Sequence, residues 1–480
     1  MAAKVEAPLV AALTAYLARG CLACHFPAHK GARGWPDFWR ELVGEGVGRL
    51  DLTELPGLDD LHAPHGPIAA AQALAASLCG AKESYFLING ASVGLMAALL
   101  GLCRPGEVVV MPRYAHRSLV AAAVLSGIRP VFLAGEYDPL WGLPTRVTPA
   151  ELDAVLASFP QAAVLVLVYP TYEGVAFDLG SLITLAHGRG LKVVVDQAHG
   201  AHFGFHASFP PGALGLGADV VVDGWHKTLG SLTQTAVLHL GQGVNFGERI
   251  ALALDFLQST SPSYPLLASI DALRAEIARR GADLWEAALA AADEVRAWLD
   301  GDWRFVVWTP GPGLTQDPLR LVVAAPSLGY DGRELALSLC ERGGLAVEAW
   351  GDRHVLLVFS LADDREVASR VVAAFRAVAA QGTADRRAET PGVLPRLAIP
   401  PAVLTPREAF FAAHRWLPLG EAVGEVAARA IVLYPPGTPL CWPGELIGEE
   451  VAHYVEIYRR RGYHLQGLSL RGEAAVVARC

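Results

Sequence analysis

Cysteine is scarce in this sequence, with seven residues among 480. The seven are an odd number and are scattered from Cys21 to Cys480. This pattern favours reduced thiols, as in a cytoplasmic protein, over a disulfide framework. Met1–Pro8 also lacks the order of charged, apolar and small residues that marks a signal peptide.

Long apolar runs and long basic runs are missing as well. The longest apolar stretches, such as Val93–Cys103, have the length of a core helix and are too short to span a bilayer. The formal net charge is −9, and no basic segment interleaved with aromatic residues occurs. We therefore expect neither a membrane nor nucleic acid to be the main partner.

Lysine is rare, since only five of the 39 Lys and Arg residues are Lys. One of them, Lys227, follows the apolar run Asp219–Val222 and stands next to His226. Lysine, unlike arginine, can lose its proton and form a Schiff base. Taken alone, this motif fits a Schiff-base lysine and an ordinary surface lysine equally.

Apolar strands of four to six residues alternate with helices from Pro67 to Asp223, which indicates an α/β fold with a mostly parallel sheet covered on both faces. We expect helices over Leu9–Arg19, Ile68–Cys79, Ser92–Leu102, Arg117–Leu125, Pro149–Ser158 and Leu179–Gly188. The expected strands are Tyr85–Ile88, Val108–Met111, Pro130–Leu133, Val164–Val168, Lys192–Val195 and Asp219–Val222.

The pattern changes after Ser261. Apolar residues recur at spacings of three and four from Leu266 to Leu299, which predicts one long amphipathic helix. A smaller α+β domain is expected next, with strands Arg304–Trp308, Leu319–Val323 and Val355–Ser360 and helices Gly332–Arg342 and Asp363–Ala380. The domains are then an N-terminal arm (1–50), a large domain (51–300), the small domain (301–380), a linker (381–401) and a C-terminal domain (402–480).

Five strand ends carry polar residues. Because function in open α/β sheets gathers at the carboxyl ends of the strands, these clusters predict one shared cleft. They are Asn89–Ser92, Arg113–His116, Tyr169–Tyr172, Asp196–His199 and Gly224–Lys227.

Asp196 and Lys227 each follow an apolar strand of the predicted sheet. They could form a structural ion pair. With pyridoxal phosphate between them, Lys227 would form the Schiff base and Asp196 would keep the ring nitrogen protonated. Gly90, Ala91 and Ser92 open a predicted helix, whose backbone N–H groups and positive end favour a phosphate, although such turns are common.

Several segments together resemble the bacterial ornithine/lysine/arginine decarboxylases, which are pyridoxal phosphate enzymes of fold type I. The segments are Asp51–His62, Asn89–Gly94, Arg113–Ser118, Pro170–Gly174, Val195–Phe203, His226–Thr228 and Tyr434–Glu445. The resemblance runs from the N-terminal arm to the C-terminal domain. It implies a homodimer or an assembly of dimers, with the active site near the subunit interface.

The resemblance also implies roles for individual residues. Lys227 would be the Schiff-base lysine and Asp196 the partner of the ring nitrogen, and His116 would stack on the cofactor ring. The expected cofactor-binding set is Gly90, Ala91, Ser92, His116, Asp196, Ala198, His199, His226 and Lys227.

The reaction implied by the resemblance is decarboxylation of a basic amino acid. Arginine ranks first because the compact chain and the motif spelling are closer to short biosynthetic arginine decarboxylases, and lysine and ornithine are the alternatives. An aminotransferase or a carbon–carbon lyase on the same fold would use Lys227 and Asp196 identically. The alternative that is not an enzyme is a catalytically silent regulatory paralogue.

Three positions depart from the family pattern. Gly224 stands where a small hydroxyl residue usually helps to hold the phosphate, and the bulky Trp225 follows it. Gln197 replaces an acidic residue, and Ala28 replaces a glycine of the arm. The departures bring cofactor affinity and substrate choice into question, and they motivate the silent paralogue.

Three further motifs have competing interpretations. Cys21–His25 fits the attachment pattern of c-type haem, but attachment requires export, so free thiols are expected. His199, His202 and His206 have spacings suited to metal ligands, yet no carboxylate or thiol completes a set, and no metal is expected. Glu445 follows the stiff segment Tyr434–Gly437 and is a candidate for binding a cationic substrate tail.

Overall fold

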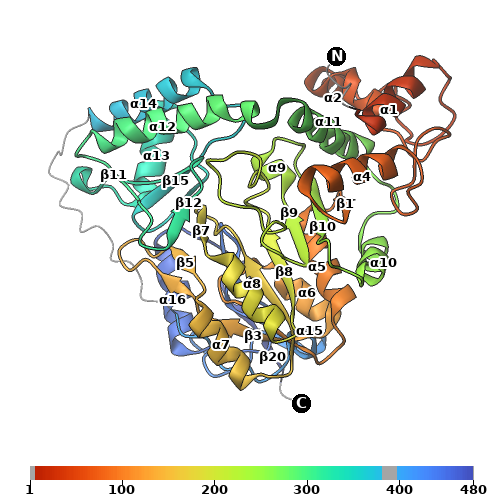
Figure 1. The fold of residues 1–480 in the computed structure, drawn as a ribbon. Helices are drawn as coiled ribbons and strands as arrows, with labels where there is room; N and C mark the ends of the chain where they lie inside the picture. The colour runs from red at the N-terminus through yellow and green to blue at the C-terminus, as the bar shows by residue number, and fades with distance from the viewer. Residues whose placement is uncertain (1–5, 381–396, 479–480) are drawn as a thin grey trace.

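The computed structural model describes residues 6–380 and 397–478. Its centre is a seven-stranded sheet in the order β1-β10-β9-β8-β6-β2-β3 (Figure 1). The strands are β1 (Glu83–Leu87), β10 (Ala236–Leu240), β9 (Val220–Asp223), β8 (Lys192–Gln197), β6 (Ala162–Val168), β2 (Val108–Pro112) and β3 (Arg129–Leu133). All six strands expected over 67–223 are present, within two residues of the expected bounds.

One strand of this sheet, β10, was not predicted. It runs antiparallel to both of its neighbours, β1 and β9, whereas β9, β8, β6, β2 and β3 are parallel to one another. The sheet is therefore mostly parallel, as expected, with a single reversed strand. In the sequence, β10 is the five-residue run Ala236–Leu240, which is apolar except for His239. In the structure, this run is buried throughout.

Alternate residues of the strands enter two separate hydrophobic clusters, one on each face of the sheet. Val110 and Leu165 belong to one cluster, and Val109 and Val164 belong to the other. This period of two is what a strand buried on both faces requires. The continuous apolar runs in the sequence are explained by this double burial.

Different helices cover the two faces. The first cluster includes residues of α1 (Pro8–Ala18), α4 (Pro67–Cys79), α7 (Pro149–Ser158), α8 (Leu179–Gly188) and α11 (Tyr264–Arg280). The second includes residues of α5 (Gly90–Leu102), α6 (Ser118–Ser126) and α10 (Gly247–Leu257). The expected helices in this part of the chain are confirmed. No helix within 6–380 or 397–478 combines the length and the apolar character needed to cross a membrane.

The prediction of one long helix from Leu266 to Leu299 is wrong. The chain instead forms α11, a 3-10 turn at Gly281–Leu284 and α12 (Glu286–Asp300). Gly281 has φ +57°, which lies in the left-handed region that an α-helix does not use. The apolar spacing continues through the break, so periodicity alone could not reveal it.

A smaller four-stranded antiparallel sheet follows, in the order β11-β13-β15-β14. Its strands are β11 (Val306–Val307), β13 (Arg320–Ala324), β15 (His354–Val358) and β14 (Ala349–Trp350). In Figure 1 it lies at the upper left with α12, α13 (Gly332–Gly343) and α14 (Arg365–Ala379). One further strand, β12 (Leu314–Gln316), pairs with β7 (Val175–Phe177) of the preceding region and so joins the two parts.

Most of the expected linker, residues 381–396, lies outside the described residues. Beyond it, β17 (Ile431–Tyr434) pairs with β18 (Thr438–Cys441) and β19 (His464–Gln466), and β16 (His414–Leu417) pairs with β20 (Ala474–Val477). These strands pack with the amphipathic helix α16 (Glu449–Arg460). The turn at Tyr434–Gly437 thus joins two paired strands.

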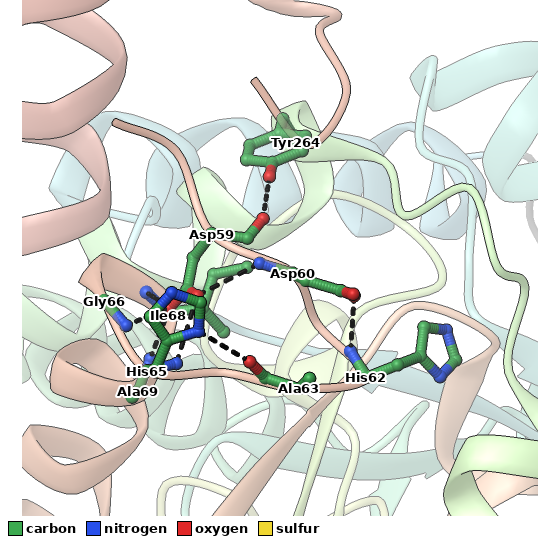
Figure 2. A network of polar contacts seen from close by, with 9 residues as sticks. All are labelled: Asp59, Asp60, His62, Ala63, His65, Gly66, Ile68, Ala69 and Tyr264. Carbon is green, nitrogen blue, oxygen red and sulfur yellow. Dashed lines mark hydrogen bonds and ion pairs between the residues drawn. The ribbon is translucent and has the colours of Figure 1, made fainter. Parts of the chain in front are cut away.

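The N-terminus of α4 is held by a carboxylate outside the helix. Asp59 is fully buried, and its oxygens accept N–H groups from the segment that leads into and begins α4 (Figure 2). The donors are His65 at 3.1 Å, Gly66 at 2.7 Å, Ile68 at 3.0 Å and Ala69 at 3.2 Å. Tyr264 of α11 donates its hydroxyl to the Asp59 carbonyl, which ties this cap to the neighbouring helix.

Candidate active site

A cavity of about 1160 Å³ lies at the carboxyl ends of the parallel strands. All five polar clusters contribute to its wall, through residues that include Ser92, His116, Tyr172, Asp196 and Lys227. The predicted shared cleft is therefore present. Residues from β14 and β15 and from 433–463 line it as well, so three parts of the chain enclose it.

Lys227 lies on α9 (Trp225–Thr228), a single helical turn directly after β9. Its side chain lines the cavity, and its Nζ lies 2.9 Å from Nε2 of His199. Burial lowers the pKa of Lys227 below its ordinary value, an effect that Asp196 opposes and Arg320 reinforces. These surroundings favour a free amine, which is the nucleophilic form.

His199 is the hydrogen-bond partner of Lys227 in the cavity. Arg320 is only a donor, and its Nη2 lies 3.3 Å from Nδ1 of His199, so this nitrogen accepts. Burial and nearby cations keep the pKa of His199 well below its usual value, so the ring is neutral. Its single proton is then on Nε2, which can donate to the uncharged form of the Lys227 amine at 2.9 Å.

Asp196 is buried at the end of β8 and lines the same cavity. Its Oδ1 accepts the Ala198 N–H at 3.1 Å. Burial raises the pKa of Asp196, whereas the charge of Lys227 and the Ala198 hydrogen bond oppose that shift. The site thus places a desolvated carboxylate and an amine in one cavity.

His116 follows β2 and accepts at Nδ1 from the Ser118 N–H at 3.2 Å. Burial lowers the pKa of His116 to about 4, and Lys227 and Arg117 add to the shift. The ring is therefore neutral at pH 7. Gly437 packs against this ring, since a Cβ at that position would lie 2.7 Å from Cδ2 of His116. The C-terminal region consequently closes over His116.

The first turn of α5 lines the cavity through Gly90, Ala91 and Ser92. Gly90 has φ +78°, and its N–H donates to the Gln234 carbonyl at 2.8 Å. The next N–H groups of a helix start have no partner within the helix and favour an anion. His226 also borders the cavity, with Nδ1 2.7 Å from the Thr235 carbonyl oxygen, so its proton is on Nδ1 and Nε2 is free to accept.

Arg320 is a site residue that sequence reasoning missed. It is buried at the start of β13, and its Nη2 donates to the His199 carbonyl at 2.9 Å. Its Nε lies 3.3 Å from Asp317, whose carboxylate pairs with the buried His202 at 3.0 Å. Gly174 makes room for it, because a Cβ there would lie 2.6 Å from Cδ of Arg320. Arg320 stands 121 positions from His199, and no local pattern signals such a contact.

The structure explains two of the three departures. Gly224 lies against the Ala198 carbonyl, and a Cβ at this position would be 2.5 Å from that oxygen, so any side chain would force the backbone to move. Gln197 points away from the cavity and joins Asp223 (2.9 Å) to the Ala213 N–H (2.7 Å). Trp225 is fully buried in the core and does not line the cavity. Ala28 does not have a positive φ, so a glycine is not required there.

Glu445 is placed differently from the expectation. Both carboxylate oxygens are held by Arg113, at 2.5 and 2.9 Å, and one also accepts the Trp442 N–H at 2.7 Å. Glu445 is buried and is not part of the cavity wall, whereas Arg113 is. This geometry indicates a structural ion pair and argues against the predicted contact with a substrate tail.

The remaining motifs stay apart from this site. Cys21 and Cys24 are exposed free thiols, and His25 contacts the Tyr16 hydroxyl at 2.9 Å. His206 pairs with Glu286 at 3.2 Å. Within 6–380 and 397–478, no group of three or more His, Cys, Asp or Glu residues is arranged to hold a metal.

The mostly parallel sheet and its strand-end cavity define an α/β protein of the aminotransferase-like fold, fold type I. Among solved structures, a lysine decarboxylase from Pseudomonas aeruginosa superimposes with a TM-score of 0.83 at 22% identity, over 99% of this chain and 81% of that one. A ureidoglycine-glyoxylate aminotransferase from Bacillus subtilis superimposes with a TM-score of 0.54 at 14% identity, over 67% of this chain and 87% of that one.

The chain belongs to the Orn/Lys/Arg decarboxylase family. The family's major domain matches residues 7–312 and its C-terminal domain matches residues 396–472. An arginine decarboxylase from Bacillus subtilis is 35% identical over 96% of this chain and 95% of its own length. A lysine decarboxylase from Pseudomonas aeruginosa is 24% identical over 94% and 76%. The family suggested by the motifs is confirmed, and decarboxylation of a basic amino acid is the reaction these comparisons support.

Proposed function

We propose that this protein decarboxylates arginine to agmatine with pyridoxal phosphate as cofactor. The observation that carries the proposal is one cavity that holds a lysine amine with a lowered pKa, a buried carboxylate and an open helix N-terminus. The similarity to a full-length relative named arginine decarboxylase favours arginine over lysine and ornithine.

The residues present fit the proposed cofactor. The first turn of α5, with Ala91 and Ser92, would take the phosphate, and Asp196 would take the ring nitrogen. Lys227 would hold the cofactor covalently, and neutral His116 would pack against the ring. The rest of the predicted set, Ala198, His199 and His226, borders the same space.

When bound, the cofactor accepts the electron pair of the bond that breaks when the carboxylate leaves as carbon dioxide. Asp196 would hold the proton on the ring nitrogen, since a buried carboxylate without a cation is costly. The C-terminal turn over His116 would exclude water, which favours loss of a charged carboxylate as a neutral gas. His199 and Lys227 are joined at 2.9 Å and are the groups placed to return a proton to the substrate.

The discriminating experiment uses purified protein, pyridoxal phosphate and carboxyl-labelled arginine, lysine and ornithine. We expect labelled carbon dioxide, released fastest from arginine. A keto acid without labelled gas would instead indicate the aminotransferase alternative. Bound cofactor with no turnover of any amino acid would indicate the silent paralogue.

Replacing Lys227 by Ala is the sharpest test of the cofactor assignment. We expect the variant to lose the visible absorption of protein-bound pyridoxal phosphate and at least about 1,000-fold of the activity, because a covalent anchor and a catalytic amine are removed together. Unchanged visible absorption would contradict the assignment. Lys192→Ala is the control, since Lys192 lies at the far end of β8 and should leave both readouts unchanged.

We further propose that the protein is a cytoplasmic homodimer, or an assembly of dimers, with the domain boundaries predicted above. Support for an interface comes from exposed apolar side chains on the N-terminal arm, including Phe26 (78% exposed), Phe38 (74%) and Leu42 (75%). Light scattering of the purified protein should give a mass of at least twice 50.9 kDa.

A further inference from the structure

Glu173 is a buried carboxylate that has no role in the proposed chemistry. It lies in the turn after β6, where the Gly174 N–H donates to the Thr171 carbonyl at 2.9 Å. Glu173 lines the cavity and is 8% exposed, and its Oε2 has no hydrogen-bond partner among the residues that the structure describes. An unpartnered buried carboxylate is costly, so such a group calls for a ligand or another explanation.

A second unpartnered polar group borders the same cavity. Tyr114 is buried, and its hydroxyl also has no hydrogen-bond partner. Burial and the nearby charges, Glu173 among them, raise the pKa of Tyr114, so the hydroxyl stays neutral. A neutral hydroxyl both donates and accepts, so a ligand that brings N–H groups could satisfy Tyr114 and Glu173 together.

Three other acids of the cavity wall are already engaged. Glu136 pairs with Arg146 at 2.7 Å, and Asp352 pairs with Arg461 at 2.6 Å. Asp138 accepts from Trp308 Nε1 at 2.9 Å and from backbone N–H groups. Glu173 Oε2 differs from these carboxylates because the chain leaves it free for a ligand.

The cation that acts electrostatically on Glu173 makes its hydrogen bonds elsewhere. Arg320 contributes to the electrostatics of Glu173, but its guanidinium donates to the carbonyls of Tyr172 and His199. The cavity wall also carries the aromatic rings of Tyr137 and Trp141, whose faces attract cations. A negative group with aromatic neighbours suits a positively charged ligand.

We propose that Glu173 and Tyr114 form the subsite for the cationic end of the substrate, a guanidinium group on an aliphatic chain. A guanidinium presents N–H donors in a fixed fork, which can serve a carboxylate oxygen and a hydroxyl at once. The proposal rests on the proposed function, because it assigns the part of the substrate distant from the reacting carbon.

The protonation of Glu173 is consistent with this role. Burial raises the pKa of Glu173 to about 7, and the Thr171 side chain and Arg320 oppose the shift only in part. The groups that interact with it are Thr171, Arg320, Tyr114 and Tyr172. A bound cation favours the ionised carboxylate, so binding should release a proton and tighten as the pH rises through 7.

The test measures binding of agmatine to the cofactor-loaded protein by calorimetry, beside its neutral ureido analogue N-carbamoylputrescine. We expect Glu173→Gln to raise the Kd of agmatine about 30-fold, the loss typical of a charge-assisted hydrogen bond, and to change the Kd of the analogue less than about threefold. With arginine as substrate, KM should rise and kcat should change little. Glu136→Gln removes the same charge from the same cavity and is the control, with less than a twofold effect expected.

Thermal unfolding distinguishes binding from a structural role. Because Glu173 titrates near 7 in the folded chain and near 4.5 when unfolded, the wild-type stability should fall as the pH rises from about 4.5 to about 7. Glu173→Gln should abolish this loss and keep or raise Tm at pH 8. A lower Tm at pH 8 with an unchanged Kd for agmatine would overturn the proposal.

The two proposals fail in different ways. If wild-type protein releases carbon dioxide from arginine but Glu173→Gln leaves KM and agmatine binding unchanged, only the subsite is wrong. If no basic amino acid is decarboxylated, the proposed function fails, and the effect of Glu173→Gln on agmatine binding still decides the subsite.

Discussion

At the scale of single residues, Lys227 is positioned by close backbone packing. Gly224 precedes the turn that carries Lys227, and its α-carbon faces the Ala198 carbonyl at a distance that leaves no room for a Cβ. Ala198 in turn follows Asp196, whose carboxylate accepts its N–H. The glycine thereby holds the strand ends of β8 and β9 together, and the lysine and the aspartate with them.

Replacing Gly224 by Ser should therefore harm the protein, even though a hydroxyl residue is expected at this position in the family. We predict a loss of about 2 kcal/mol in the free energy of unfolding, because a backbone oxygen must move, and reduced activity through displacement of Lys227. Urea unfolding and carbon dioxide release measure the two effects. Gly243→Ser is the control, since nothing lies within 4 Å of a Cβ at that exposed position. Equal stability of the two variants would refute the argument.

At the scale of elements, α4 depends on a carboxylate that is distant from its own first residue. The helix begins with Pro67 after Gly66, and neither offers a capping side chain. Asp59 supplies the acceptor, and four of its five N–H contacts connect the preceding loop to the first turn (Figure 2). Burial alone would raise the pKa of Asp59, but the backbone hydrogen bonds outweigh it and lower the pKa below 3.8.

Asp59→Ala should cost about 2 kcal/mol in the free energy of unfolding, because several buried N–H groups lose their acceptor at once. The pH dependence follows from the lowered pKa of Asp59. Its contribution to the free energy of unfolding is present above pH 3.8 and is lost as the pH falls through the pKa of the folded protein. Urea unfolding of wild type and variant at pH 7 and pH 3 should show the difference shrinking at the lower pH. Asp60→Ala removes one acceptor from the same loop and should have a smaller effect at pH 7. A difference that grows at pH 3 would contradict the assignment.

At the scale of the whole molecule, a buried ion pair joins the large sheet to the C-terminal region. Arg113 follows β2, and Glu445 lies 332 positions away. The guanidinium stacks over Phe132 at 4.7 Å, and the Phe132 ring packs on Trp442. Arg113 also donates to the Leu440 carbonyl at 3.0 Å, so the pair holds β18 beside the cavity.

Glu445→Gln should destabilise the protein by about 3 kcal/mol, because it leaves the buried Arg113 charge without a partner. The double variant Arg113→Met with Glu445→Met should recover part of this loss, since no charge is then stranded. Thermal unfolding and KM for arginine measure stability and substrate binding separately. Glu276→Gln removes a carboxylate of an exposed pair and should leave Tm unchanged. A large rise in KM without a loss of stability would restore Glu445 as a substrate contact.

The sequence pattern predicts six of the seven strands of the large sheet, most helices, and the cluster of Lys227, Asp196, His116 and the start of α5. These features follow from local patterns, because apolar runs bury on both faces and the polar residues at their ends meet at one edge. Four features are visible only in the folded chain: the break at Gly281, the reversed strand β10, the contact between Arg320 and His199, and the pairing of Glu445 with Arg113. Each of these features depends on a backbone conformation or on a contact between segments far apart in the chain. Local sequence patterns predict neither the conformation nor the contact.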